Sequence, residues 1–204
     1  VPQGGEVATG TLIDVLEQRD LDPTHPALIY TDRIVDYDEF EERTNRIARA
    51  LLAEGVSPDD VIAVALERSI ESVIAAWGVI KSGAAFMAVD PDYPVERIEY
   101  MLTDSHVRWG ITDSSTLAGL PAVTTCEWKS LEDFEDATIS GAPISDAERN
   151  GSVRLTNLAY LIYTSGSTGR PKAVGVSNTG VVDLIEAHAK VTGSLDDDPD
   201  TRIL

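Results

Sequence analysis

Three short apolar runs, separated by two helical patterns, constrain the fold of this chain more than any other part of it. The runs are rich in Val, Ile and Ala, as in strands buried on both faces of a sheet: VIAVAL (61–66), AFMAV (85–89) and VRWGIT (107–112). Between them, residues 69–81 and 95–103 carry apolar side chains at helical spacing. Strands alternating with helices in this way predict an α/β fold with a doubly wound parallel sheet flanked by helices.

The residues before the first of these strands predict a helix, a β-hairpin and a second, longer helix. The first helix and the two short strands are expected at 11–19, 27–30 and 33–35. Asp36 and Glu39 are spaced as a capping box, which marks the start of the longer helix. Gly55 follows its last apolar position and is expected to end it.

A glycine-rich loop occupies the C-terminal part of the chain. The sequence YTSGSTGRPK (163–172) follows the apolar run LAYLIY (158–163) and precedes the strand-like AVGVS (173–177), and a helix is expected from 179 to 190. A Walker loop needs its lysine directly after the second glycine and a helix next, whereas here Pro171 intervenes and a strand follows. The register therefore excludes a Walker-type ATPase and predicts a loop that joins two strands.

The composition of this loop still suits a phosphate group. Glycines at 166 and 169 tolerate positive φ and let backbone N–H groups converge on an anion. Hydroxyl groups at 164, 165, 167 and 168 add donors, and Lys172 adds a compact positive charge. Composition alone leaves a plain Ser/Gly hairpin as the alternative.

The charge and the cysteine content restrict the classes of partner. The chain has 35 acidic and 16 basic residues, a net charge of −19, which disfavours binding to nucleic acid or to an anionic membrane surface. The single cysteine, Cys126, cannot form an internal disulfide and is interpreted as a packing residue in a cytoplasmic protein. No apolar run reaches membrane-spanning length, and no two of the 3 histidines are spaced as metal ligands.

Residue identity favours the phosphate interpretation. The stretch LAYLIYTSGSTGRPKAV (158–174) closely resembles the signature of the adenylate-forming superfamily, which contains acyl-CoA synthetases, adenylation domains of nonribosomal peptide synthetases and luciferases. Residues 80–105 and 35–56 resemble two further segments of the same superfamily, and the likeness is strongest to amino-acid-activating domains. Three positions depart from the usual pattern, in which Pro, Gly and His are common: Ala88, Ala173 and Asn178.

The resemblance implies a reaction and a set of partners. In such enzymes a substrate carboxylate attacks the α-phosphate of Mg-ATP, and the acyl group then passes to a phosphopantetheine thiol on a carrier domain. It implies ATP and Mg²⁺ as cofactors, an amino acid as substrate, and peptidyl carrier and condensation domains of the same synthetase as partners. By the same analogy, the residues that bind the β- and γ-phosphates are Thr164, Ser165, Gly166, Ser167, Thr168, Gly169 and Lys172.

The resemblance also predicts the extent of the domain. Residues 1–204 are expected to form the N-terminal portion of an adenylation domain, the first part of its large N-terminal lobe, with residues 130–156 as a surface connection. The substrate-selectivity motif and the small C-terminal lobe are expected beyond Leu204, so no catalytic residue is assigned here and this stretch alone is not expected to activate an amino acid. Two alternatives stay open, an acyl-CoA or aryl-acid ligase and a non-catalytic remnant that contacts neighbouring synthetase domains.

Overall fold

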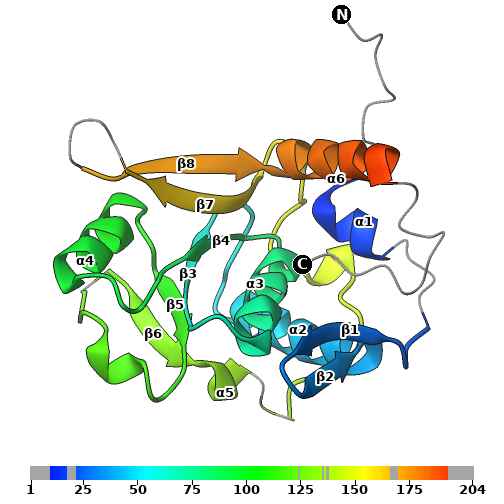
Figure 1. Cartoon of the computed structure of the whole chain (residues 1–204), viewed down its shortest axis with the longest axis horizontal. Helices are drawn as coiled ribbons and strands as arrows, with labels where there is room; N and C mark the ends of the chain where they lie inside the picture. The colour runs from blue at the N-terminus through cyan, green and yellow to red at the C-terminus, as the bar shows by residue number, and fades with distance from the viewer. Residues whose placement is uncertain are drawn as a thin grey trace, which may run out of the picture.

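A six-stranded sheet forms the centre of the molecule (Figure 1). The computed structural model describes residues 10–17, 22–123, 125–134, 136, 138–165 and 170–192, with side chains up to residue 187. The strands lie in the order β6-β5-β3-β4-β7-β8. Their bounds are β3 (Val61–Ala65), β4 (Ala85–Ala88), β5 (Trp109–Thr112), β6 (Glu127–Ser130), β7 (Leu158–Thr164) and β8 (Lys172–Ser177).

Five of these strands are parallel, in agreement with the predicted parallel sheet. The edge strand β8 is antiparallel to its neighbour. Strands β6, β5, β3, β4 and β7 pair in parallel, whereas β8 runs antiparallel to β7. The short connection between β7 and β8 explains the difference, because parallel neighbours need a crossover of a dozen or more residues. The doubly wound sheet is thus confirmed, with one antiparallel strand added at its edge.

Helices cover both faces of the sheet, as alternate side chains of β3 demonstrate. Ile62 and Val64 pack in one apolar cluster with α3 (Ile70–Ser82), α2 (Tyr37–Ala53) and the short α5 (Leu131–Phe134). Ala63 and Ala65 pack in another cluster with α4 (Val95–Asp104). Since successive strand residues point to opposite faces, α3 and α4 lie on opposite sides of the sheet.

The start of helix α2 follows the predicted signal, and the two ends of α3 are also capped. The Asp36 carboxylate accepts a 2.8 Å hydrogen bond from the backbone N–H of Glu39 at the start of α2. Ser69 and Ser72 form a reciprocal capping box at the start of α3. Gly83 ends α3 with φ of +92°, a left-handed conformation that glycine adopts without steric cost.

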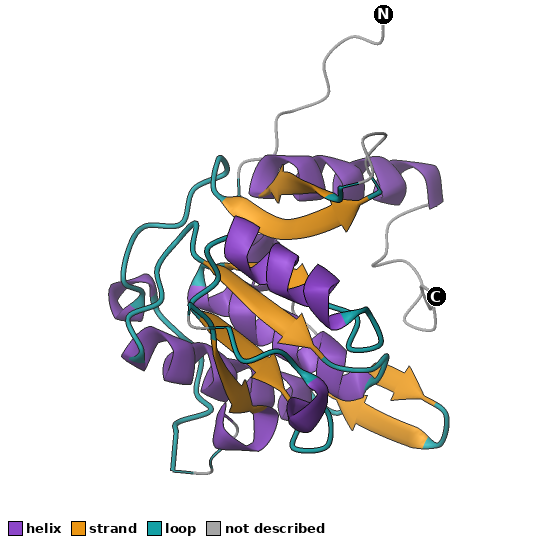
Figure 2. Ribbon diagram, turned by 90° about the vertical axis from the view of Figure 1, so that its left-hand side faces the viewer, coloured by secondary structure: helices purple, strands orange, loops and turns teal. Residues whose placement is uncertain are grey.

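The remaining elements lie around this core. The hairpin of β1 (Pro26–Tyr30) and β2 (Arg33–Asp36) forms a separate two-stranded sheet that projects from the body of the molecule (Figure 2). Helix α1 (Leu12–Glu17) contacts α6 (Asn178–Thr192). The first helix was predicted to continue to residue 19, and its last two residues lie outside the described part of the chain.

The predicted surface connection at 130–156 starts at the last residue of β6 and includes α5. Side chains of helix α2 bind the backbone of its middle part. Arg49 donates from its guanidinium to the carbonyl oxygens of Ser140, Ala142 and Pro143 at 2.6–2.8 Å. Asn45 donates to the carbonyl of Gly141 at 3.0 Å. Side chain–backbone bonds therefore order a stretch that has almost no regular secondary structure.

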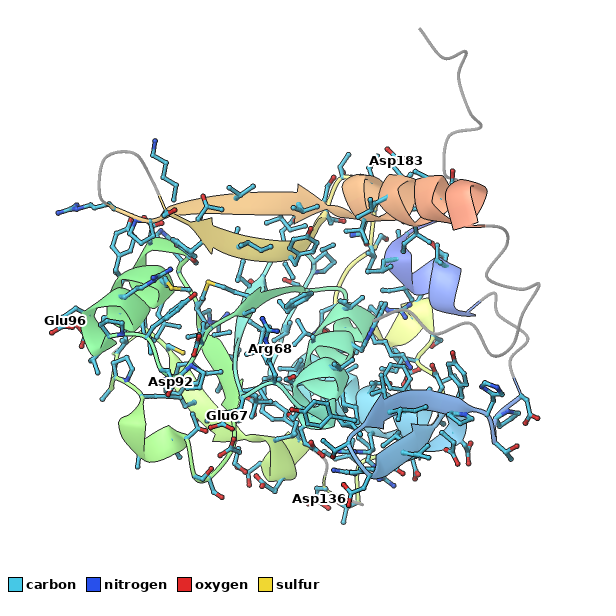
Figure 3. All side chains as sticks on the ribbon, viewed as in Figure 1. Glu67, Arg68, Asp92, Glu96, Asp136 and Asp183 are labelled. Carbon is cyan, nitrogen blue, oxygen red and sulfur yellow. The ribbon has the colours of Figure 1, made fainter. Side chains whose placement is uncertain are left out.

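Charged side chains lie mainly at the surface. Acidic residues such as Glu96, Asp136 and Asp183 project from the periphery in Figure 3. A buried exception is Lys81, whose ammonium group donates to Glu41 at 2.5 Å and to Asn45 at 3.0 Å. Across the described ranges, no helix is long and apolar enough to cross a membrane.

Candidate functional site

The candidate site is the connection between β7 and β8, where the sequence places the glycine-rich loop. The two strands pair antiparallel, with Thr164 opposite Lys172 at the end where the loop joins them. This register brings the first and the last of the predicted phosphate-binding residues side by side, as the hairpin prediction required. Thr164, Ser165 and Lys172 are all exposed. Gly166, Ser167, Thr168 and Gly169 lie outside the described residues.

The position of the hairpin in the sheet suits a ligand site. Strand β7 is parallel to β4, so Thr164 lies at the edge of the sheet where the parallel strands have their carboxyl ends. In open α/β sheets ligands bind in the crevice at that edge. The C-terminal half of helix α4 lies next to the same end of the hairpin (Figure 1).

The two faces of the hairpin differ in their surroundings. Leu161 and Tyr163 point into the core beside α4 and are 8% and 9% exposed. Ile162 and Val174 face each other on the opposite side and are 46% and 47% exposed. Since Thr164 and Lys172 follow at a spacing of two, they share this open face. The buried face anchors the hairpin, and the open face presents the polar groups.

Helix α4 contacts the hairpin through polar groups that the sequence did not reveal. The Tyr163 hydroxyl donates to the Asp104 carboxylate at 2.7 Å, and the Ser105 hydroxyl lies 2.7 Å from the Tyr163 oxygen. Burial, together with the nearby negative charge of Asp104, raises the pKa of Tyr163 above its ordinary value, so its proton stays available as a donor. The Tyr100 hydroxyl donates to the Pro171 carbonyl at 3.3 Å.

No pattern in the sequence pointed to Tyr100, Asp104 or Ser105. Their partners Tyr163 and Pro171 lie 58–71 residues away along the chain. Hydrophobic periodicity identifies which face of α4 is buried, but it does not identify what that face meets. The only available signal was the alternation in LAYLIY, which places Tyr163 on the same face as Leu161.

Two of the three departures from the usual family pattern have a structural account. Asn178 is 4% exposed; its side-chain oxygen accepts from the Leu12 N–H at 3.2 Å and its amide nitrogen donates to the Asn157 carbonyl at 3.1 Å. It therefore joins α1 and the entry to β7 to the start of α6. Ala173 lies within β8, opposite Tyr163, in extended backbone that any residue adopts. Nothing in the structure explains Ala88, an exposed residue at the end of β4.

Other candidate groups lie away from the hairpin. Two small clefts formed by described residues, beside Lys81 and at the amino ends of β3 and β5, have no hairpin residue in their lining. Within the ranges that the structure describes, no group of three His, Cys, Asp or Glu side chains is placed to hold a metal ion. Cys126, predicted to pack, is 8% exposed. Neither cleft is therefore part of the candidate site at the hairpin.

Comparison with known proteins identifies related sequences and folds. A family model described as "AMP-binding enzyme" matches residues 16–204. Tyrocidine synthase 3 of Brevibacillus parabrevis is 40% identical to this chain over 172 residues, which are 83% of this chain and 3% of that protein. This chain thus spans only a small part of that relative.

Two solved structures have a similar fold. The nonribosomal peptide synthetase FmoA3 superposes with a TM-score of 0.74 at 25% identity, over 83% of this chain and 17% of that one. The N-terminal subdomain of NpsA from Klebsiella oxytoca superposes with a TM-score of 0.68 at 26% identity, over 79% of this chain and 40% of that one.

Proposed function

This chain belongs to the AMP-binding enzyme family, and on that premise we propose that it is part of an adenylation domain that makes an aminoacyl-adenylate from an amino acid and Mg-ATP. The similarity to tyrocidine synthase 3 and to FmoA3 supports an amino acid as the substrate. The acyl group then passes to the thiol of phosphopantetheine on a carrier domain of the same synthetase, next to a condensation domain.

The hairpin supports a defined role in the first step. A substrate carboxylate oxygen forms a bond to the α-phosphorus of ATP, the bond from that phosphorus to the bridging oxygen breaks, and pyrophosphate leaves with the electron pair. Negative charge therefore grows on the β- and γ-phosphates. Donors fixed at that position stabilise the transition state more than the ground state. Mg²⁺ arrives with ATP as its complex, and no residue of this chain is assigned to it.

The location of Lys172 is the main support for this role, because it places a cation beside hydroxyl groups at the carboxyl edge of the sheet. Its register partner Thr164 and the next residue, Ser165, supply hydroxyl donors on the adjoining strand end. The loop residues Gly166, Ser167, Thr168 and Gly169 are proposed to add backbone N–H and hydroxyl donors. In a chain of net charge −19, an anion binds only where cations and donors are concentrated locally.

The magnitude for Lys172 follows from its exposure. Two unit charges 4 Å apart interact by about 1 kcal/mol in water and about 4 kcal/mol near a protein surface. Lys172 is exposed without ligand and becomes partly desolvated against phosphate, so an intermediate value applies. Lys172→Ala is expected to lower kcat/KM for Mg-ATP by about 10- to 100-fold, or about 1.4–2.8 kcal/mol.

The test measures exchange of labelled pyrophosphate into ATP. The chain replaces the corresponding segment of tyrocidine synthase 3, to which it is 40% identical over 172 residues, and exchange that depends on the amino acid is measured with and without Lys172→Ala. Arg154→Ala is the matched control, because Arg154 is an exposed cation that precedes β7, at the opposite end of that strand. Equal kcat/KM values for the two variants would contradict the role of Lys172.

A further inference from the structure

Helix α4 contacts the hairpin next to Thr164 and next to Lys172, the two residues that flank the loop. On the β7 side it binds Tyr163, the residue before Thr164. On the β8 side it binds Pro171, the residue before Lys172. One helix therefore holds the two strand ends from which the proposed phosphate-binding side chains project.

The contact with Tyr163 combines burial with a hydrogen-bond network. The Tyr163 ring packs edge-on against the Tyr100 ring, with centroids 6.2 Å apart and an interplanar angle of 76°. Its hydroxyl bonds to Asp104 and lies 3.3 Å from the Met101 carbonyl at the end of α4. These contacts restrain both the position and the rotation of the last buried side chain of β7. Because Thr164 follows Tyr163 in the chain, the position of its backbone is restrained as well.

The contact with Pro171 fixes a peptide plane. Proline has no backbone N–H, so its carbonyl is its only hydrogen-bonding group. The Tyr100 hydroxyl donates to this carbonyl. The same rigid peptide unit contains the nitrogen of Lys172, because the peptide bond is planar. Orienting the carbonyl of Pro171 therefore orients the backbone from which the Lys172 side chain departs.

Helix α4 is itself held firmly by the core. Ile98, Met101 and Leu102 are at most 1% exposed and pack in the cluster that includes β3 and β4. A support of this kind matters because the backbone of an edge strand beside a loop otherwise samples several positions. Fixing the backbone of Lys172 before the ligand arrives reduces the entropy that binding must overcome.

We propose that Tyr100 and Tyr163 are positioning residues that act through helix α4 to orient Lys172 and Thr164 toward the phosphates of the nucleotide. This role rests on the proposed function, since it assigns no ligand of its own. It differs from a packing role in one measurable respect. The contribution of the Tyr100 hydroxyl to phosphate binding depends on the charge of Lys172, and that of the Tyr163 hydroxyl depends on the hydroxyl of Thr164. Their contributions to folding depend on neither group.

The experiment uses the chain as it stands and inorganic tripolyphosphate as the probe. Binding is measured by titration followed through backbone amide NMR signals, which detects weak complexes, and the thermal unfolding midpoint is measured for every variant. Tyr100→Phe and Tyr163→Phe keep the ring and remove the hydroxyl. Tyr30→Phe is the matched control, because Tyr30 is a 50% exposed tyrosine on the β1–β2 hairpin.

Each of the two hydroxyl deletions is expected to weaken tripolyphosphate binding, and Tyr30→Phe to leave it unchanged. The 3.3 Å bond of Tyr100 is longer than the usual 2.5–3.0 Å, so about a 3-fold loss is expected there, and about a 3- to 10-fold loss for Tyr163. In a Lys172→Ala background Tyr100→Phe is expected to change binding by less than 2-fold, since coupled residues are not additive. The same limit is expected for Tyr163→Phe in a Thr164→Val background, which lacks the Thr164 hydroxyl.

The outcomes separate this inference from the proposed function. If Lys172→Ala weakens binding but neither hydroxyl deletion does, the positioning role is overturned and the phosphate site stands. If Tyr100→Phe weakens binding equally with and without Lys172, or Tyr163→Phe equally with and without the Thr164 hydroxyl, the effect is general to the fold and the positioning role is again overturned. If the unsubstituted chain shows no titration, or Lys172→Ala changes nothing, the proposed function fails and the positioning role fails with it.

Discussion

Gly78 lies where helices α2 and α3 cross, and replacing it with alanine has two opposing effects on stability. Alanine favours the helix, whereas its methyl group crowds the contact between the helices. A Cβ atom built on Gly78 would lie 2.5 Å from Cγ2 and 2.6 Å from Cβ of Ile47. Ile47 is fully buried, and its Cβ is attached to the backbone of α2, so no rotamer change moves the Cβ atom aside. The helices must separate or shift for the methyl group to fit.

The magnitudes decide the sign of the effect. Alanine is favoured over glycine inside a helix by about 1 kcal/mol. Overpacking of a well-packed core costs about 1–3 kcal/mol, and the contact with a Cβ atom places this site in the upper part of that range. Gly78→Ala is therefore expected to lower the free energy of unfolding by about 1–2 kcal/mol. For a chain of this length the unfolding midpoint would fall by about 2–8 °C.

Urea unfolding followed by circular dichroism measures the change, with Gly180→Ala as the control. Gly180 lies in α6, where a Cβ atom would meet only the end of the Val176 side chain at 3.3 Å. The control is expected to be as stable as the parent or more stable by up to about 1 kcal/mol. If Gly78→Ala unfolds at the same urea concentration as Gly180→Ala, the close packing of α2 on α3 is refuted.

Two further predictions concern ionisation. Burial raises the pKa of the Cys126 thiol from 9.0 to about 12, so alkylation by iodoacetamide at pH 8 should be about 1000-fold slower in the folded chain than in urea, and equal rates would contradict its burial. Hydrogen bonds from Ser115 and Thr116 hold the pKa of the Asp113 carboxyl in the folded chain below its ordinary value of 3.8. The ionised carboxylate therefore stabilises the folded chain above pH 3.8, and this stabilisation is lost as the pH falls through the lower pKa of the folded chain. Asp113→Asn should therefore reduce stability at pH 6 and have less effect at pH 2.5, as acid-unfolding curves will test.

Local signals in the sequence predicted most elements to within a few residues. The cap at Asp36, the glycine at 55 and the apolar run at 61–65 each act through their own backbone or through neighbours in the chain. Such interactions span three or four residues and are therefore visible as patterns. The glycine-rich loop also belongs here, because a lysine after Pro171 and a following strand exclude a Walker loop by the order of residues alone.

The tertiary structure decided which groups meet across the fold. Periodicity placed Lys81 inside a helix pattern, but only the packing of α3 on α2 buries its ammonium group beside Glu41 and Asn45. By contrast, the antiparallel course of β8 follows from its short connection to β7, which the sequence itself shows.

The same division holds at the candidate site. The sequence by itself determined the residue types of the candidate hairpin and the order in which strand, loop and strand follow one another. Only the folded chain brought Tyr100 and Asp104 of α4 against the two strand ends that flank the loop. The physical reason is that a side chain's periodicity reports the direction in which it points, whereas its partner is set by how separate elements pack around one core.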